Sequence, residues 1–265
     1  MLLSKTTSRV SSDFQAKTFV DQVVDALLKR ALQGIILPGE RLYEADLSRD
    51  LGISRAPIRE ALRILEGQGV IESIPYRGTR LAPLSSERIR HINLVRFELE
   101  RLALGAALSS VKRSMIHDLE GNVKAMSMAA DHDERLTLAK LDTEFHGIIC
   151  SHGGNPVIGA MWAILRPQLL IVFGVSMFAK DPSDLVKEHV SLLTAIGDKS
   201  AEKAIEVLRG HILRDNMEID FEVLVQQRRA EANRLSDAQH MPNSPSHLVS
   251  RRPRGRPRRV QSPVE

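Results

Sequence analysis

Apolar residues recur at helical spacing along most of the chain. Between Lys17 and Gln33 they fall three or four residues apart, which is the spacing of one buried helix face. The segment that follows, GIILPGE at 34–40, carries two glycines and a proline, and these residues end a helix. The folded part of the chain is therefore expected to begin with a helix over residues 17–33.

The pattern over residues 43–84 predicts a helix, a turn at Gly52, a second helix and a β-hairpin. Ser54 stands where it can cap the second helix, and Pro57 falls in the first turn of that helix, where a missing N–H costs little. Short alternating runs then surround Arg77 and Gly78, which is typical of a hairpin. With the helix before them, these elements predict a winged helix-turn-helix of three helices and a β-hairpin wing, over residues 16–84.

After Ser85 the spacing of apolar residues stays helical up to about Arg234. Helices are expected near residues 85–110, 113–130, 133–152, 155–178, 182–197 and 200–234. This pattern predicts an all-α bundle over residues 85–234, so the fold class is mainly α. The flanking segments, 1–15 and 235–265, are polar or rich in Pro, Ser, Asn and Arg, and we expect them to be disordered.

Composition and charge narrow the class of protein. The single cysteine, Cys150, excludes an intrachain disulfide framework and a thiolate zinc site. The longest apolar run, at 169–178, is too short to span a bilayer, so a soluble cytoplasmic protein without a membrane partner is expected. The net charge is +4, but residues 251–265 hold six Arg and one Glu. The rest of the chain therefore sums to −1, and the basic character lies in the tail.

The first candidate for chemistry is the second helix of the helix-turn-helix. Such a helix enters the major groove with its N-terminal residues foremost. Here that end carries Ser54, Arg55 and Arg59, and arginine can bind guanine edges or phosphates. Arg77 and Gly78 at the hairpin tip suit a minor-groove or phosphate contact. The alternative is a surface helix pair with ordinary exposed arginines.

The second candidate is an acid and a histidine one helical turn apart. Asp142 and His146 lie in LDTEFHGIIC among apolar residues, on one face of a predicted helix. They can form a hydrogen-bonded pair, or they can be half of a metal site. His189 and His211 also lie among apolar residues on predicted helices, and the four together would suit Zn²⁺, Ni²⁺, Mn²⁺ or Fe²⁺. Spacing along the chain does not establish that these helices converge, so both interpretations remain open.

The third candidate is the basic tail, RRPRGRPRR at 251–259. Its centre, Pro253 to Pro257, resembles the Pro-Arg-Gly-Arg-Pro core of an AT-hook. Arg254 and Arg256 would lie along a narrow A·T minor groove, and Gly255 would let the backbone approach the groove floor. The alternative is a polycation that binds DNA without preference.

Three stretches of the N-terminal part carry a family resemblance. LPGERL (37–42), LGISRAPIREALRILEGQGVI (51–71) and RGT (77–79) resemble the DNA-binding domain of the GntR family of bacterial transcription regulators. The resemblance implies that Ser54, Arg55 and Arg59 contact the operator and that Gly78 lies at the wing tip. Ala45 departs from the pattern, because the family often has an arginine there. One typical DNA contact is therefore missing.

Four stretches of the C-terminal part resemble the FCD ligand-binding domain of FadR-like GntR regulators. They are VRFELERLALGAAL (95–108), LDTEFHGII (141–149), EHVSLLTAIGDKSAEKA (188–204) and LRGHI (208–212). The resemblance implies an antiparallel helical bundle whose pocket, in metal-containing members, is lined by an aspartate and three histidines. The matching positions are Asp142, His146, His189 and His211. The acyl-CoA-binding branch lacks this set.

A metal ion with open coordination positions can also bind a small carboxylate, and Arg96 is the candidate cation for that effector. The alternative for Arg96 is a pair with Glu100 on the helix surface. The resulting hypothesis is a metabolite-responsive regulator, not an enzyme, which binds operator DNA as a homodimer and acts as a repressor. The rivals are a metalloenzyme fused to a DNA-binding domain, and an architectural DNA-binding protein driven by the tail.

Overall fold

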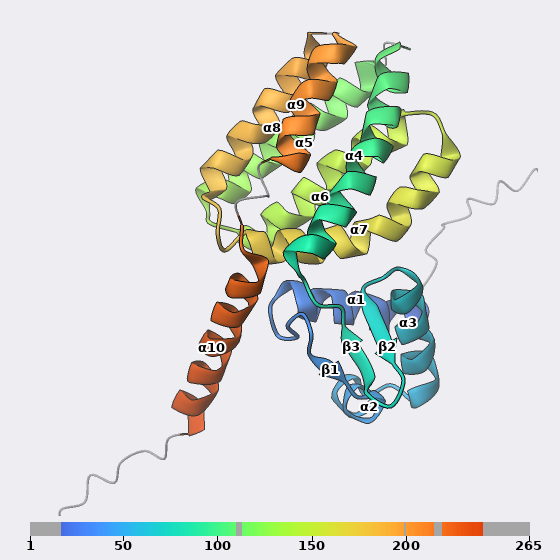
Figure 1. Ribbon diagram of the computed structural model, residues 1–265, viewed down its shortest axis with the longest axis vertical. Helices are drawn as coiled ribbons and strands as arrows, with labels where there is room; N and C mark the ends of the chain where they lie inside the picture. Colours follow the sequence, from blue (N-terminus) through green and yellow to red (C-terminus); the bar gives the residue numbers. More distant parts are fainter. Residues whose placement is uncertain (1–16, 110–112, 199, 215–218, 241–265) are drawn as a thin grey trace, which may run out of the picture.

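The computed structural model describes residues 17–109, 113–198, 200–214 and 219–240, without the side chains of 232, 233 and 235–240. The chain forms a small N-terminal unit of three helices and three strands beneath a larger helical bundle, and one further helix extends away from the bundle (Figure 1). Of the segments expected to be disordered, residues 1–15 and 241–265 lie outside the described residues, and so does the AT-hook-like sequence. Residues 235–240 were also expected to be disordered, but they belong to a helix instead. The mainly α fold predicted from the sequence is confirmed.

The N-terminal unit contains the predicted helix-turn-helix. Its helices are α1 (Phe19–Leu32), α2 (Glu44–Leu51) and α3 (Arg55–Gly67). Thr18 and Asp21 form a capping box at the start of α1, which satisfies N–H groups that have no partner within the helix. Gly52 ends α2 with a φ of 66°, a left-handed conformation that glycine adopts without strain. The turn predicted at Gly52 is therefore confirmed.

A three-stranded antiparallel sheet completes this unit. The predicted hairpin is β2 (Ile71–Ile74) and β3 (Gly78–Leu81), with Ile74 opposite Gly78. A further strand, β1 (Arg41–Leu42), pairs with the outer side of β3. The sequence did not indicate β1, because two residues are too short to show an alternating pattern.

Six helices form the bundle: α4 (Ser86–Ser109), α5 (Arg113–Asp131), α6 (Arg135–His152), α7 (Pro156–Ser176), α8 (Pro182–Gly197) and α9 (Ala201–Leu213). Asn155 and Asp181 cap α7 and α8, and each is followed by a proline that tolerates the first helical position. Helix α6 packs against α4, α5 and α7, so its side chains point into the middle of the bundle.

The single helix predicted over 200–234 is wrong, because the chain forms two helices there. Helix α9 ends at Leu213, and α10 spans Phe221–His240. The Asp220 carboxylate accepts a hydrogen bond from the Val223 N–H at 3.0 Å, which caps the new helix. The helix also continues past residue 234, the expected end of the bundle.

Helix α7 carries most of the apolar run 169–178 at its C-terminal end, and the run continues two residues past the helix. By length and composition alone this 21-residue helix could cross a membrane, with a mean hydropathy of 1.7 over its most apolar window. In the structure it packs against α6, α4 and α1 instead. Gly174 lies against Leu32 of α1, and a Cβ added to Gly174 would stand only 2.5 Å from Leu32 Cδ1. Packing inside the protein therefore accounts for the buried part of α7, while Val157, Met161 and Ile164 remain exposed.

Helix α10 lies across the junction between the bundle and the N-terminal unit. The Glu222 carboxylate accepts hydrogen bonds from the backbone N–H and the hydroxyl of Ser86, at the start of α4. Further along the helix, Arg228 stacks 3.6 Å above the Phe178 ring, and Arg229 donates to the Pro38 carbonyl at 3.1 Å. The helix thus contacts both parts of the molecule.

Candidate DNA-reading surface and metal centre

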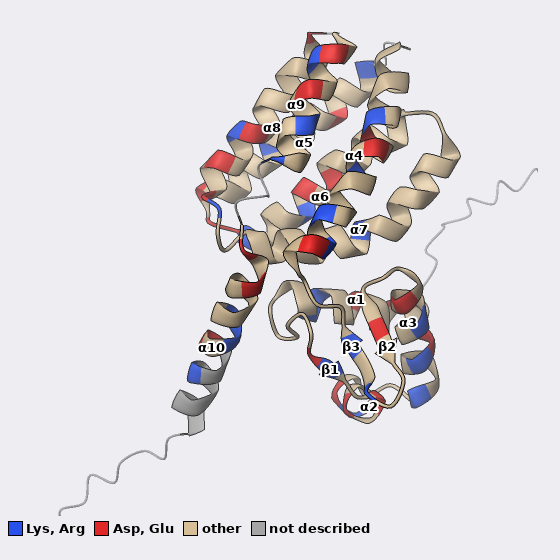
Figure 2. Cartoon of the chain, viewed as in Figure 1, with Lys and Arg blue, Asp and Glu red and all other residues tan. Residues whose placement is uncertain are grey.

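The N-terminal end of α3 is open to solvent. Ser54, Arg55 and Arg59 are all exposed, and the arginine positions of α3 are drawn in blue along the helix (Figure 2). Ser54 takes the extended N-cap conformation, but its hydroxyl makes no capping hydrogen bond. Its hydroxyl is therefore available to a phosphate or a base.

The two arginines, Arg55 and Arg59, differ in their hydrogen-bond partners. Arg59 forms two hydrogen bonds with the Glu44 carboxylate, at 3.2 and 3.0 Å, and this pairing lowers the pKa of Glu44. Among the described residues, the Arg55 guanidinium has no hydrogen-bond or ion-pair partner. Ala45 is exposed beside Glu44 and offers no cation. Arg55 is thus the unpaired guanidinium at the leading end of α3.

The tip of the β2–β3 hairpin exposes Arg77 and Gly78, as the sequence predicts. Gly78 has a φ of 83°, a conformation that side chains disfavour. Tyr76, which was not predicted as a tip residue, is fully exposed at the same tip with a φ of 63°. Its position between the two predicted strands could have marked it as a residue of the hairpin tip.

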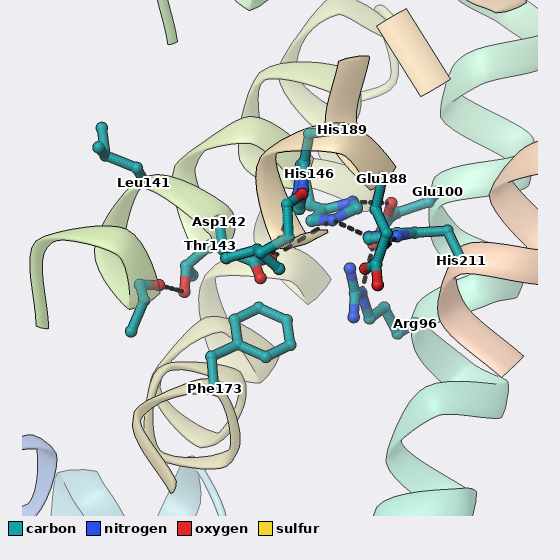
Figure 3. Close-up of polar contacts among 12 residues, drawn as sticks. Arg96, Glu100, Leu141, Asp142, Thr143, His146, Phe173, Glu188, His189 and His211 are labelled. Atoms are coloured by element: carbon teal, nitrogen blue, oxygen red, sulfur yellow. Dashed lines mark hydrogen bonds and ion pairs between the residues drawn. The ribbon is translucent and has the colours of Figure 1, made fainter. Parts of the chain in front are cut away.

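The four candidate metal ligands converge inside the bundle (Figure 3). Helix α6 supplies Asp142 and His146, α8 supplies His189, and α9 supplies His211. All four side chains are buried. The structure therefore brings together the residues whose convergence the sequence could not establish.

The spacing of these side chains fits one metal ion. The ring nitrogens of His146, His189 and His211 that face one another lie within 4.8 Å. The His146 and His211 Nε2 atoms are 3.1 Å apart, and Asp142 Oδ1 lies 3.5 Å from His146 Nε2 and 3.6 Å from His189 Nε2. Around a tetrahedral ion with bonds of about 2.0–2.1 Å, adjacent ligand atoms stand about 3.3–3.4 Å apart. The observed distances lie close to that value.

The outer ring nitrogens have partners that orient the histidines. His189 Nδ1 lies 2.9 Å from the Leu185 carbonyl, and this nitrogen must donate because a carbonyl only accepts. His146 Nδ1 lies 2.6 Å from the Glu100 carboxylate, whereas His211 Nδ1 lies 3.5 Å from that of Glu188, which is an ion-pair contact rather than a hydrogen bond. Carbonyl and carboxylate partners of this kind leave the Nε2 lone pair for a metal.

Charge states in the cluster also suit a metal. Burial, and then the positive charge of Arg96, lowers the pKa of His146, and burial with the neighbouring histidines lowers that of His211. Burial alone would raise the pKa of Asp142, but the attraction of His189, His146 and Arg96 outweighs it and leaves this pKa below its usual range. Neutral imidazoles and an ionised carboxylate are the forms that bind a cation.

The structure does not form the self-satisfied Asp142–His146 pair. Their nearest atoms, at 3.5 Å, are an ion-pair contact, and Asp142 Oδ1 accepts no hydrogen bond from the described residues. His189 Nε2 has no hydrogen-bond partner either. Buried polar atoms without partners are rare, and a metal ion between these two atoms would satisfy both.

Arg96 lies beside this cluster. It is 1% exposed, donates to the Glu100 carboxylate at 2.7 Å, and stands 4.9 Å above the Phe173 ring. Its Nη2 atom has no partner among the described residues. The alternative of a surface pair with Glu100 is wrong, because the pair exists but is buried. The contact of Glu100 with His146 was not predicted from the sequence, although the place of Glu100 one turn after Arg96 in an apolar stretch was a signal.

Together these parts define a class of protein. A winged helix-turn-helix with an exposed arginine-bearing helix is joined to a helical bundle with a buried polar centre, which is the organisation of a ligand-responsive DNA-binding protein. The comparisons with known families agree. The family profile described as "Bacterial regulatory proteins, gntR family" matches residues 19–81, and the profile described as "FCD domain" matches residues 91–214. The chain belongs to the GntR family of transcription regulators, with an FCD C-terminal domain.

Individual relatives match this chain over about three quarters of its length. The uncharacterised regulator YdhC of Bacillus subtilis is 28% identical over 73% of this chain and 88% of its own. The transcriptional repressor RspR of Escherichia coli is 23% identical over 73% of this chain and 86% of its own. The solved structure of E. coli McbR/YncC shares the fold, with a TM-score of 0.64 and 22% identity over 80% of this chain and 99% of that one. This is a family of regulators and not of enzymes.

Proposed function

We propose that this regulator represses transcription and that a small carboxylate, bound beside a metal ion in the bundle, controls its affinity for the operator. The observation that carries the proposal is the convergence of three Nε2 atoms and the Asp142 carboxylate next to the unpartnered Nη2 of Arg96. Relatives that are named as repressors support repression rather than activation. The proposed place of action is the cytoplasm.

His146, His189, His211 and Asp142 would hold the ion. A divalent ion with open positions supplies a Lewis-acid contact for a carboxylate or hydroxyl oxygen. The Arg96 guanidinium, already paired with Glu100 through Nε, would present Nη2 to the same carboxylate. Glu100 would then serve two parts of the site, because its carboxylate contacts both Arg96 and His146.

The path from this site to DNA runs through α7 and α10. Phe173 lies under Arg96 on α7, and the next residue, Gly174, packs against Leu32 of α1 in the DNA-binding unit. A displacement of α7 by the effector would therefore press directly on α1. Rigid packing at this contact supports a change in the orientation of the DNA-binding unit.

We propose that the protein acts as a homodimer. Helix-turn-helix dimers bind two half-sites about one helical turn apart. Helix α7 exposes Val157, Met161 and Ile164, which follow one another at four and three residues and so form one apolar stripe. A second copy of the chain would cover this stripe.

The test starts from DNA selected out of a random library by the full-length protein. Fluorescence anisotropy then measures affinity for that DNA while small organic acids are added to metal-loaded protein. At least one carboxylate should weaken binding, and the response should vanish in protein stripped of metal and in Arg96→Met. A response that persists in both, or no response to any acid, contradicts the proposal.

A further inference from the structure

Lys180 separates two cavities. The inner cavity lies beside Arg96, Asp142 and His211 and has a volume of about 10 Å³ for the centre of a water molecule, so it holds one water at most. The outer cavity, about 540 Å³, lies between α8 and the start of α10 and opens to solvent. Lys180 lines both cavities. It is the residue that the two linings share, so a ligand that passed directly from the outer cavity to the inner one would meet this side chain.

An ion pair holds Lys180 at the boundary. Its Nζ atom lies 3.2 Å and 3.4 Å from the two carboxylate oxygens of Glu188, and its side chain is 14% exposed. Glu188 Oε2 is also 3.5 Å from His211 Nδ1. Arg135 donates to the Lys180 carbonyl at 3.2 Å and to the Met177 carbonyl, which fixes the turn that carries the lysine. One carboxylate thus contacts both the boundary lysine and a candidate metal ligand.

We propose that Lys180 is a second cationic contact for the effector's carboxylate. Until the effector arrives, the Glu188 carboxylate occupies the position beside Lys180 that the effector's carboxylate would take. This inference rests on the proposed function. An entering carboxylate would meet Lys180 on its outer side and the unpartnered Nη2 of Arg96 on its inner side. Exchange of one carboxylate for another at Lys180 leaves the local charge unchanged. Glu188, which is 25% exposed and lines the outer cavity, can then turn toward solvent.

The outer cavity also narrows the chemical class of the effector. Its rim carries the carboxylates of Asp181, Asp184 and Asp220, while the side toward α10 is apolar through Ile219, Val223 and Leu224. A second carboxylate on the effector would lie among these acids and be repelled. The favoured effector is therefore a monocarboxylate whose remainder is uncharged. Residues 219–224 lie beyond the FCD match at 91–214, so this wall comes from a part of the chain that the family profile does not include.

The experiment compares butyrate with succinate, which have the same number of carbon atoms and differ by one carboxylate. Full-length protein loaded with Co²⁺ is titrated with each acid by calorimetry, and visible absorption follows the ion's coordination. Butyrate should bind about tenfold more tightly than succinate. Asp220→Asn should narrow this preference, because it removes one of the repelling charges and asparagine can still cap α10.

The variants of Lys180 test the contact itself. Lys180→Met should weaken butyrate binding about tenfold while one Co²⁺ per chain is retained, and Lys180→Arg should restore binding. If Lys180→Met binds butyrate as the unmodified protein does while Arg96→Met does not, Lys180 is no effector contact and the proposed function stands. Equal or tighter binding of succinate by the unmodified protein overturns the monocarboxylate class. If the Co²⁺-loaded protein binds neither acid, the inference and the proposed function fall together.

Discussion

At the scale of single residues, the proposed metal centre would depend on groups that do not touch the ion. Glu100 accepts from Arg96 at 2.7 Å and contacts His146 Nδ1 at 2.6 Å, so one buried carboxylate orients both a candidate ligand and the candidate effector contact. Burial raises the pKa of Glu100, although Arg96 opposes this. A residue in this position fixes the ring orientation and basicity of the histidine.

Glu100→Gln should therefore lower metal affinity by about 10- to 100-fold. Competition against a chromophoric chelator measures the affinity, and circular dichroism checks that the variant is folded. Glu98→Gln is the matched control, because Glu98 lies on the same helix but is exposed and pairs with Arg101. Equal affinities in the two variants would remove Glu100 from the metal site.

Arg55→Ala should weaken specific operator binding by about 1–3 kcal/mol and relax base preference. The reason is that Arg55 is exposed at the leading end of α3, whereas Arg59 is already paired with Glu44. A gel-shift titration measures the loss. Arg101→Ala removes the same charge from the bundle and should leave affinity unchanged. An Arg55 variant that matches the Arg101 variant would show that α3 is not the reading helix.

At the scale of helices and strands, the sequence predicted most of the fold because each long helix carries its own apolar period. The elements that the sequence did not predict depend on a distant pairing partner or on a single capping residue. Strand β1 has two residues and forms only because β3 lies beside it, and Asp220 divides the predicted last helix by a local cap. Glu100 contacts His146 from a helix far away in the chain, so the sequence marked only its spacing from Arg96 and not this second contact.

The apolar stripe of α7 leads to a prediction for assembly. Ile164→Glu places a charge on the stripe and should convert the dimer to a monomer at micromolar concentrations, as measured by sedimentation velocity. Val190→Glu is the control, because Val190 on α8 has the same exposed fraction, 44%, but lies outside the stripe. A dimer that survives Ile164→Glu, or one that Val190→Glu disrupts equally, would place the interface elsewhere.

At the scale of the whole molecule, sequence resemblance identified the four residues of the centre, and the structure showed that they meet. Asp142 and His146 share a helix, so their proximity follows from helix geometry. His189 and His211 come from two other helices, and only the packing of α8 and α9 against the rest places their Nε2 atoms beside His146. The basic tail lies outside the described residues, and its role stays a prediction.

Deletion of residues 251–265 should make the dependence of log K on log salt shallower, by up to about five if all six arginines neutralise phosphates. A minor-groove arm reads groove width, so the loss should be larger for operators flanked by A·T tracts than for G·C flanks. Anisotropy titrations on both flanks at two salt concentrations measure this. Equal losses would mean that the tail is a polycation without sequence preference.

We expect Asp142, His146, His189 and His211 to hold one divalent metal ion. Elemental analysis of full-length protein, purified without chelators, should find one divalent ion per chain. His146→Ala, His189→Ala or His211→Ala should each lose most of it and lower the melting temperature, because an ion that binds only the folded state stabilises that state. His132→Ala, which changes an exposed histidine outside the cluster, should keep it. Protein without stoichiometric metal, or with metal that survives all three ligand variants, would contradict the account.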